Sequence, residues 1–316
     1  MAERLAAAGG DTLVSPIPPI PTSEIAAPDR GQTFWRFLRE TFRGATLIGA
    51  LMVLVVLVLA IGAPIFALHD PQSQDLLNTT APPAFVHGGS WNHPFGTDAL
   101  GRDIWARIVW GLRTSLLVAV PAVILGAGFG VWVGTVAGYF GGVVDTVLMR
   151  LTDVQMAFPF IILAIAVLSV ATPSPVVLVI VLSLSAWPIY ARVTRSITVV
   201  DSQSEYVLAA RSMGASHLRI IVRYLLRNLI VSIAVLSTLD VATMIVLEAL
   251  LSFLGMGIQP PTPSLGNVMA DGREYLALGV WWITTLPGVA ILFTLLGLNL
   301  LGDGLQSKLD PRLRRV

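Results

Sequence analysis

Cysteine is absent from the 316-residue sequence, and only 12% of the residues are charged. Without cysteine the chain can form no disulfide, no thiolate zinc site and no thiol nucleophile. Soluble domains carry about 25% charged residues, so the few charges here cannot cover the surface of a soluble protein of this length. The apolar surface must face something other than water, and lipid is the expected medium.

Lysine occurs once, at Lys308, and it is not part of a G-x-x-x-x-G-K-[ST] loop. Such a loop needs its lysine to reach the phosphates of a nucleotide. We therefore expect no cofactor in this chain, and any ATP and Mg²⁺ must be bound by a partner. The net charge of +1 also argues against a nucleic-acid partner.

The first 33 residues are rich in alanine, proline and serine and contain no apolar core of a signal peptide. We interpret residues 1–33 as a disordered cytoplasmic tail. Residues 34–112 would hold the first span and an external loop. Residues 113–302 would form the transmembrane core, and residues 303–316 a cytoplasmic C-terminal tail.

Long apolar runs predict six membrane-spanning helices. About 20 apolar residues cross the ~30 Å hydrocarbon core of a bilayer, and residues 45–68 contain no charge at all. Two prolines, Pro173 and Pro175, split a long uncharged stretch into two spans. The predicted spans are residues 45–68, 113–145, 153–171, 175–192, 228–254 and 277–301.

The second span is rich in glycine. Small residues let helices approach closely in lipid, which favours tight helix packing over a ligand site. The glycines are Gly126, Gly128, Gly130, Gly134 and Gly138.

Basic residues predict the orientation. With six spans, both termini and the loop between spans four and five lie on the same side of the membrane. This side carries fifteen arginines and lysines, and the opposite side carries four. Cytoplasmic segments collect such residues. Both termini are therefore expected in the cytoplasm, and residues 69–112 and 255–276 outside.

The loop between spans four and five contains a predicted short helix over residues 202–213. Ser202 and Glu205 have the S-x-x-E spacing of a capping box, which would start the helix at Ser202. Gly214 suits the position that ends it. The residues between follow helical spacing: Tyr206, Ala209, Ala210 and Met213. Its small side chains favour docking on a protein over the alternative, an interfacial helix resting on lipid.

This loop resembles the EAA loop of bacterial ABC importer permeases. The resemblance rests on EYVLAARSMG from Glu205 to Gly214, followed by RIIVRYLLRN from Arg219 to Asn228. The family pattern has proline where Arg227 stands here, which weakens the helix-breaking signal at that point. The resemblance implies a type I importer fold, in which this helix couples the permease to an ATPase subunit.

Further motifs resemble the C-type permeases of dipeptide, oligopeptide and nickel importers. They include HPFGTDALGRDIWARIVWGLRTSL from His93 to Leu116 and EALLSFLGMG from Glu248 to Gly257. The resemblance implies half of a pore, a second permease subunit, two ATPase subunits and an extracytoplasmic substrate-binding protein. Contact with that binding protein is assigned to the region 91–110.

Asp240 and Glu248 lie within the fifth span. Ionisable groups in a bilayer normally face the protein interior or a water-filled path. One interpretation places both on the translocation pathway, together with Phe158, and the other has them hydrogen-bonded to a neighbouring helix. Both interpretations stay open from the sequence.

Other polar groups have more ordinary interpretations. Asp145, Arg150 and Asp153 are expected to form a structural charged cluster. Arginines at four-residue spacing form a stripe at the membrane edge; they are Arg219, Arg223 and Arg227. The stripe is expected to contact anionic lipid, and the alternative is that it contributes to an inner gate. Three histidines of the outer loop, His69, His87 and His93, suggest nickel, but their spacing matches no compact ligand motif. They are interpreted as ordinary loop residues, and no metal site is expected.

Rival functions are a secondary transporter driven by an ion gradient and a membrane-embedded enzyme. The first does not explain the docking helix, and the second lacks an H-E-x-x-H motif. Among importers, di- and oligopeptides are the leading substrates, with nickel or another small solute as the alternative.

Overall fold

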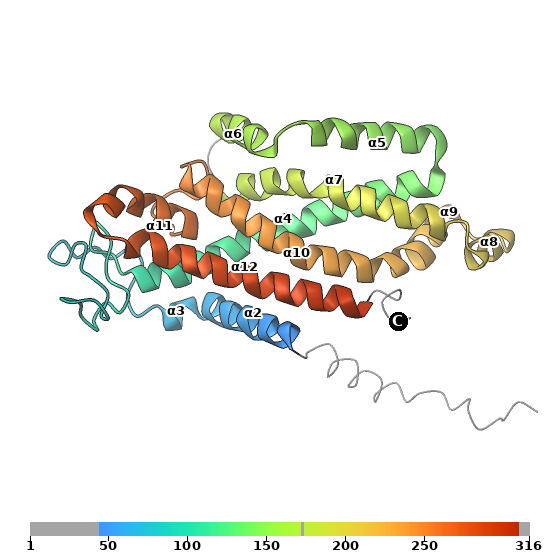
Figure 1. Cartoon of the computed structure of the whole chain (residues 1–316). Coiled ribbons are helices and arrows are strands. Elements are labelled where there is room, and N and C mark those ends of the chain that lie inside the picture. Colours follow the sequence, from blue (N-terminus) through green and yellow to red (C-terminus); the bar gives the residue numbers. More distant parts are fainter. Residues whose placement is uncertain (1–43, 172–173, 310–316) are drawn as a thin grey trace, which may run out of the picture. The chain divides into compact units, whose positions relative to one another are not determined.

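The structure is a computed structural model that describes residues 44–171 and 174–309, and these ranges fold into helices joined by loops (Figure 1). Within them the only strand-like pairing is an isolated bridge between Thr97 and Asp103. The predicted tail over residues 1–33 and the last residues, 310–316, lie outside the described ranges. The predicted all-helical class is confirmed.

The helices follow one another along the chain with short connections. Their bounds are α2 Ala45–Ile61, α3 Ala63–Phe66, α4 Ile104–Phe140, α5 Gly142–Ala157, α6 Phe160–Val170, α7 Pro175–Asp201, α8 Glu205–Ser212, α9 His217–Ile220, a π-helical turn Ile221–Leu225, α10 Leu226–Phe253, α11 Leu265–Gly272, a 3₁₀ segment Arg273–Leu278 and α12 Trp282–Leu309.

Four helices in the described ranges are long and apolar enough to cross a membrane: Ile104–Phe140, Pro175–Asp201, His217–Phe253 and Trp282–Ser307. The α5–α6 pair would make a fifth span if it is counted as one, although it is bent by 84°. The remaining predicted span corresponds to α2, an apolar helix of 17 residues. The structure thus bears out a multi-span helical protein, while the number six stays a prediction.

The predicted bounds of the second span differ from those of α4. This helix begins at Ile104, where Asp103 caps it by accepting a hydrogen bond from the backbone of Ala106 at 2.7 Å. It ends at Phe140 because the next two residues, Gly141 and Gly142, have positive φ, which breaks the helix before the predicted end at residue 145.

The third span was predicted as one helix over residues 153–171, and the structure replaces it with a bent pair. Phe158 has an extended backbone, with φ −89° and ψ 130°, and Pro159 follows. Proline disfavours helical geometry in the residue before it and cannot donate a backbone hydrogen bond. The chain therefore turns between α5 and α6.

The predicted cytoplasmic loop after residue 192 is largely helical. α7 continues to Asp201, and one continuous helix runs over His217–Phe253 through a π-helical turn. The absence of proline at Arg227 is consistent with this continuity, because nothing there interrupts the backbone hydrogen bonds.

The glycine-rich face of α4 packs closely against α7, as the sequence predicted. A side chain at Gly130 would place its Cβ 2.7 Å from the Cβ of Tyr190, and one at Gly138 would lie 2.8 Å from the carbonyl of Arg195. Gly128 differs, since a Cβ there would have nothing within 4 Å. The glycine stripe, which consists of Gly126, Gly130, Gly134 and Gly138 at four-residue spacing, is therefore the surface of α4 that contacts α7.

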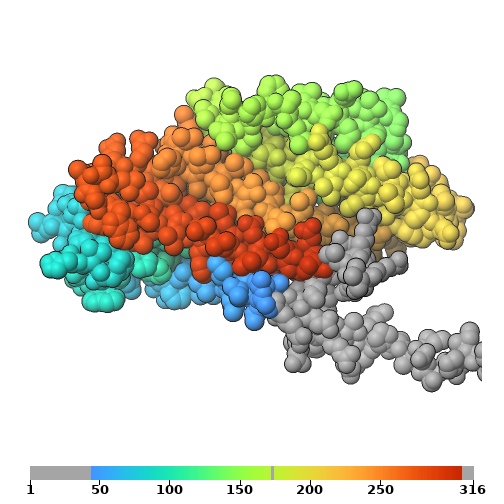
Figure 2. All heavy atoms as spheres, in the orientation of Figure 1, coloured from blue at the N-terminus to red at the C-terminus, as the bar shows by residue number. Residues whose placement is uncertain are grey.

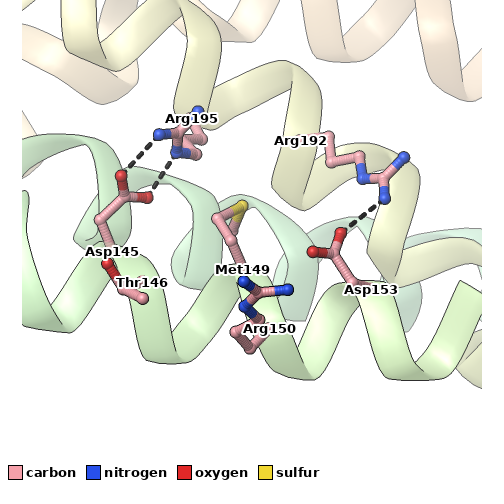
Figure 3. Close-up of a pocket in the computed structure, with 7 residues that line it drawn as sticks. All are labelled: Asp145, Thr146, Met149, Arg150, Asp153, Arg192 and Arg195. Carbon is pink, nitrogen blue, oxygen red and sulfur yellow. Dashed lines mark hydrogen bonds and ion pairs between the residues drawn. The ribbon is translucent and has the colours of Figure 1, made fainter.

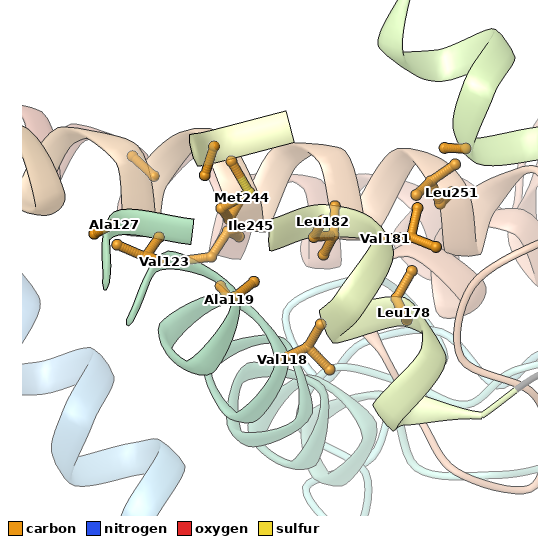
Figure 4. Packing of buried hydrophobic residues seen from close by; sticks show 14 of the residues in the cluster. Val118, Ala119, Val123, Ala127, Leu178, Val181, Leu182, Met244, Ile245 and Leu251 are labelled. Carbon is orange, nitrogen blue, oxygen red and sulfur yellow. The ribbon is translucent and has the colours of Figure 1, made fainter. Parts of the chain in front are cut away.

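A core of buried aliphatic side chains joins α4, α7 and α10 (Figure 4). Its members include Val118, Val123, Leu178, Leu182 and Ile245. α2 packs along α12, where a Cβ on Gly297 would lie 2.9 Å from that of Met52. Figure 2 shows α5 and α6 as an outer ridge beside this group of helices.

α8 and α9 lie at one end of the helices (Figure 1). The loop over residues 67–103, called the outer loop because the sequence predicts it to be external, lies with α11 at the other end. The two functional regions predicted from the sequence, the docking helix and the external loop, are therefore at opposite ends.

Candidate coupling helix and translocation residues

The predicted start of the docking helix is wrong. Ser202 ends α7, and its hydroxyl donates to the carbonyl of Val199 at 2.9 Å. A turn follows, and α8 begins at Glu205 after Ser204, whose side chain does not cap the helix. The capping box does not form because α7 continues through the residues that would precede it.

The predicted end of the docking helix is confirmed. Gly214 has a φ of +80°. Its backbone donates to Arg211 at 3.0 Å, and Ala215 donates to Ala210 at 3.0 Å. This pair of hydrogen bonds is the Schellman motif, which glycine favours because it adopts positive φ without strain.

The two faces of α8 have different surroundings. Val207 and Ala210 are 0% and 1% exposed, and Val207 packs in a small cluster with Tyr139, Ile220 and Leu225. Ala210 therefore belongs to the inner face, although the sequence interpretation grouped it with the docking residues. The exposed face contains Glu205, Tyr206, Leu208, Ala209, Ser212 and Met213.

Polar contacts connect the α8 region to the spanning helices. The Tyr139 hydroxyl, near the end of α4, lies 2.7 Å from Nδ1 of His217. The amide of Asn228 donates to the Tyr206 hydroxyl at 2.8 Å and to Oδ2 of Asp201 at 3.2 Å. Of these groups only Tyr206 belongs to α8, which also packs against Tyr139 of α4 through Val207. α8 therefore contacts α4 and α10 directly, and Asn228 connects it to Asp201 of α7.

Asp240 lies in the middle of α10 and is partly buried. Its Oδ2 atom is buried and has no hydrogen-bond partner in the described part of the chain. The Tyr190 hydroxyl of α7 donates to Ser237, one turn away on α10, at 3.1 Å. Asp240 therefore offers a carboxylate oxygen that the described residues do not satisfy.

Glu248 has a different environment, because the described protein surrounds it completely. It is 0% exposed. Ser115 of α4 donates to one carboxylate oxygen at 2.6 Å, and Ser252 donates to the other at 2.7 Å. This arrangement corresponds to the alternative in which the group holds neighbouring helices together.

Two ion pairs join α5 to α7 (Figure 3). Arg195 forms a two-point pair with Asp145, and Arg192 contacts Asp153 at 2.7 Å. Arg150 lies between the pairs without joining either. The expected cluster therefore forms only in part: Asp145 and Asp153 pair with arginines of α7 that the sequence analysis did not name, and the predicted contribution of Arg150 is wrong. Phe158, just beyond it, is 60% exposed.

The predicted lipid-facing stripe is on the surface. Arg219, Arg223 and Arg227 are all exposed, along the continuous helix that follows α8. Whether the stripe contacts lipid or an inner gate stays a prediction.

A buried charge network organises the outer end. Arg107 is 3% exposed and pairs with Asp98 of the loop and with Asp271 of α11, the latter at 3.0 Å. Arg102 contacts the same two carboxylates, at 2.6 and 2.9 Å. The HPFGTDALGRD motif therefore fixes the loop onto α4 and α11.

The three outer histidines separate. His69 and His93 come together, with ring centroids 4.7 Å apart, whereas His87 is exposed and is not part of the group that they form with Asp103. Within region 91–110, Trp91 is 82% exposed, and Trp105 donates to the carbonyl of Phe66 at 2.9 Å.

Comparisons with known proteins agree with this architecture. Residues 130–315 match the family described as binding-protein-dependent transport system inner membrane component. The dipeptide transport system permease protein of Haemophilus influenzae is 37% identical over 284 residues, which cover 90% of this chain and 95% of that protein.

Two other relatives give the same picture. The di/tripeptide transport system permease protein of Pseudomonas aeruginosa is 36% identical, over 94% of this chain and 97% of its own length. The glutathione transport system permease protein of Escherichia coli is 38% identical, over 92% and 94%. The chain belongs to the binding-protein-dependent transport system inner membrane component family and is a multi-pass permease of the ABC importer type.

Proposed function

We propose that this chain forms half of a bacterial inner-membrane pore for di- and oligopeptides, which a substrate-binding protein delivers. Relatives named for dipeptide, di/tripeptide and glutathione transport support this substrate class, because each covers nearly the whole chain. A second permease subunit would supply the other half of the pore.

The observation that carries the proposal is the exposed face of α8. It presents Ala209 and Met213 beside Tyr206 and Leu208, at the end of the helices away from the outer loop. Two ATPase subunits would bind ATP and Mg²⁺, and one would receive α8 in a surface cleft. Both termini would then lie in the cytoplasm, on the side of α8.

The contacts of α8 suggest how force reaches the pore. When ATP closes the ATPase dimer, α8 would move with it, and its contacts with Tyr139 of α4 and Asn228 of α10 would tilt these two helices. Asn228 also bonds to Asp201, so α7 would follow. A ligand shifts a conformational equilibrium only when it binds the two states differently. The docked surface must therefore differ between the inward-open and outward-open states.

The peptide-importer function has two alternatives. The same architecture could import nickel or another small solute, since selectivity is shared with the binding protein. An ion-driven secondary transporter would also use several spans, but it gives the exposed α8 no function.

The test is a bulky substitution on the exposed face of α8. In the importer reconstituted with its partners, Ala209→Trp should abolish peptide uptake and peptide-stimulated ATP hydrolysis, because the indole prevents docking. Ala209→Ser and Leu77→Trp, the latter at the 96% exposed Leu77 of the outer loop, should retain both activities. Normal uptake by the assembled Ala209→Trp importer would refute the docking function.

A further inference from the structure

Three potential metal ligands meet at the outer end of the chain from three separate segments. His69 follows α3, His93 lies in the middle of the outer loop, and Asp103 is the residue that caps α4. Their ligand atoms all lie within 4.8 Å of one another.

The distances show how closely the three side chains converge. Oδ2 of Asp103 lies 2.8 Å from Nδ1 of His93 and 3.6 Å from Nδ1 of His69. The Asp103 side chain is 1% exposed, the His93 side chain 15%, and the His69 side chain 41%. The site is therefore buried at the carboxylate and open to solvent at one imidazole.

Hydrogen bonding explains only part of this arrangement. Oδ1 of Asp103 accepts from the backbone of Ala106, and Oδ2 is shared with His93. The 3.6 Å separation to His69 is too long for a hydrogen bond. A second imidazole nevertheless faces the same oxygen.

We propose that His69, His93 and Asp103 bind a divalent transition-metal ion, such as Zn²⁺, on the outer face of the protein. Two imidazole nitrogens and one carboxylate oxygen are the ligands of a first-row transition metal, rather than of Ca²⁺ or Mg²⁺. A water molecule would fill the fourth position, as in open zinc sites.

The separations of the donor atoms suit such an ion. Zinc lies about 2.0–2.2 Å from nitrogen and oxygen ligands, so tetrahedral donors stand roughly 3.3 Å apart. The 3.6 Å separation is near this value, and the 2.8 Å separation between His93 and Asp103 would widen by roughly 0.5 Å to admit the ion. When Nδ1 of a neutral His93 binds the ion, the ring proton lies on Nε2 instead of between Nδ1 and Asp103, so both donor atoms offer a lone pair to the metal.

The surroundings hold the three segments in place without a metal. Trp105 donates to the carbonyl of Phe66, which fixes the chain just before His69. Ile104 donates to the carbonyl of Gly96 at 3.1 Å, which fixes the segment after His93. Because the ligands are already held in place, metal binding loses less conformational entropy.

The cavity at this site also carries negative charge. Its volume is about 400 Å³, and Asp75 lines it together with the three ligands. Hydrogen bonds from the Asn78 amide and the Leu77 backbone hold the pKa of Asp75 below its ordinary value, so that carboxylate stays ionised and favours a cation. A bound metal would connect the segment after α3 to the start of α4.

Metal binding is measured on the assembled importer, purified through a tag without histidine. Equilibrium dialysis against Zn²⁺ should show one more bound ion per copy of this chain in the wild type than in the His69→Ala/His93→Ala double variant. His87→Ala is the matched control, because this exposed histidine of the same loop is outside the cluster, and it should bind as the wild type does.

A conservative variant separates ligation from folding. Asp103→Asn keeps an Oδ1 acceptor for the Ala106 backbone but removes the carboxylate charge, and it should weaken Zn²⁺ binding by at least about tenfold. Equal binding by the wild type and the double variant would overturn the proposal. If the variants fail to assemble, Co²⁺ is added to the wild type instead. The proposal then requires a visible ligand-field absorption band of Co²⁺ bound by nitrogen and oxygen ligands, and the absence of this band would overturn it.

Discussion

At the residue scale, Glu248 shows how a carboxylate can be held inside a membrane protein. Glu248→Ala removes the acceptor for Ser115 and Ser252, and each buried hydroxyl left unsatisfied costs about 1–3 kcal/mol. We expect a lower thermal midpoint and a lower yield of the assembled importer. Glu248→Gln should lose much less, because its amide can still bond both hydroxyls. An alanine variant that assembles normally but does not transport would instead place Glu248 on the pathway.

Asp240 leads to the opposite expectation, since one of its oxygens is buried without a partner among the described residues. If it faces the pathway, this oxygen can accept a hydrogen bond from the ammonium group of a peptide. Asp240→Asn should then reduce uptake of peptides with a free amino terminus several-fold, more than uptake of N-acetylated peptides. Parallel uptake assays with both peptides give the comparison. Equal uptake of every substrate by the variant would remove Asp240 from the pathway.

Single residues also show what a sequence can reveal. Asp240 and Glu248 are recognisable as unusual because they interrupt an apolar run. The partner of Glu248 on α4 is not recognisable, since Ser115 lies 133 residues from it and a hydroxyl in an apolar helix carries no pairing signal. The same limit applies to the metal ligands: His69, His93 and Asp103 have no motif spacing, and only the folded loop brings them together.

At the element scale, the contact between α4 and α7 depends on glycine. Gly130→Leu would force a side chain against Tyr190, and overpacking typically costs about 1–3 kcal/mol. We expect this variant to assemble poorly and to unfold at a lower temperature. Gly128→Leu is the matched control, because open space surrounds that position and leucine favours helix more than glycine does. Equal stability of the two variants would contradict the packing function of the stripe.

The elements were predicted unevenly, and the reasons are physical. Hydropathy indicated the apolar spans, and the glycines indicated that α4 packs closely against another helix, since both signals are local. The partner, α7, became known only from the structure. The predicted start of α8 is wrong because the spacing of Ser202 and Glu205 is a local signal, whereas the continuation of α7 to Asp201 depends on its packing in the fold. The bend at Phe158 is not evident from the apolar run, because a proline inside a run can either kink one helix or separate two, and the 84° angle appears only in the fold.

At the scale of the whole molecule, α8 and the outer loop lie at opposite ends of the spanning helices. The absence of cysteine makes this directly measurable, because a single introduced thiol is the only one in the chain. The proposed orientation predicts that Leu77→Cys, at a position 96% exposed, reacts with a membrane-impermeant maleimide in cells whose outer membrane has been opened. Met213→Cys, at a position 79% exposed, should react only after the inner membrane is disrupted.

The same pair of thiols tests the docking function of α8. In inner-membrane vesicles of inverted orientation, Met213→Cys should react quickly when this chain is expressed alone and slowly when the ATPase subunits are present, because the docked subunit covers the exposed face of α8. Leu77→Cys, enclosed in the vesicle, should be insensitive to the ATPase. Rapid labelling of Leu77→Cys from outside these vesicles would reverse the orientation, whereas labelling of Met213→Cys that ignores the ATPase would leave the orientation intact and reject α8 as the docking surface.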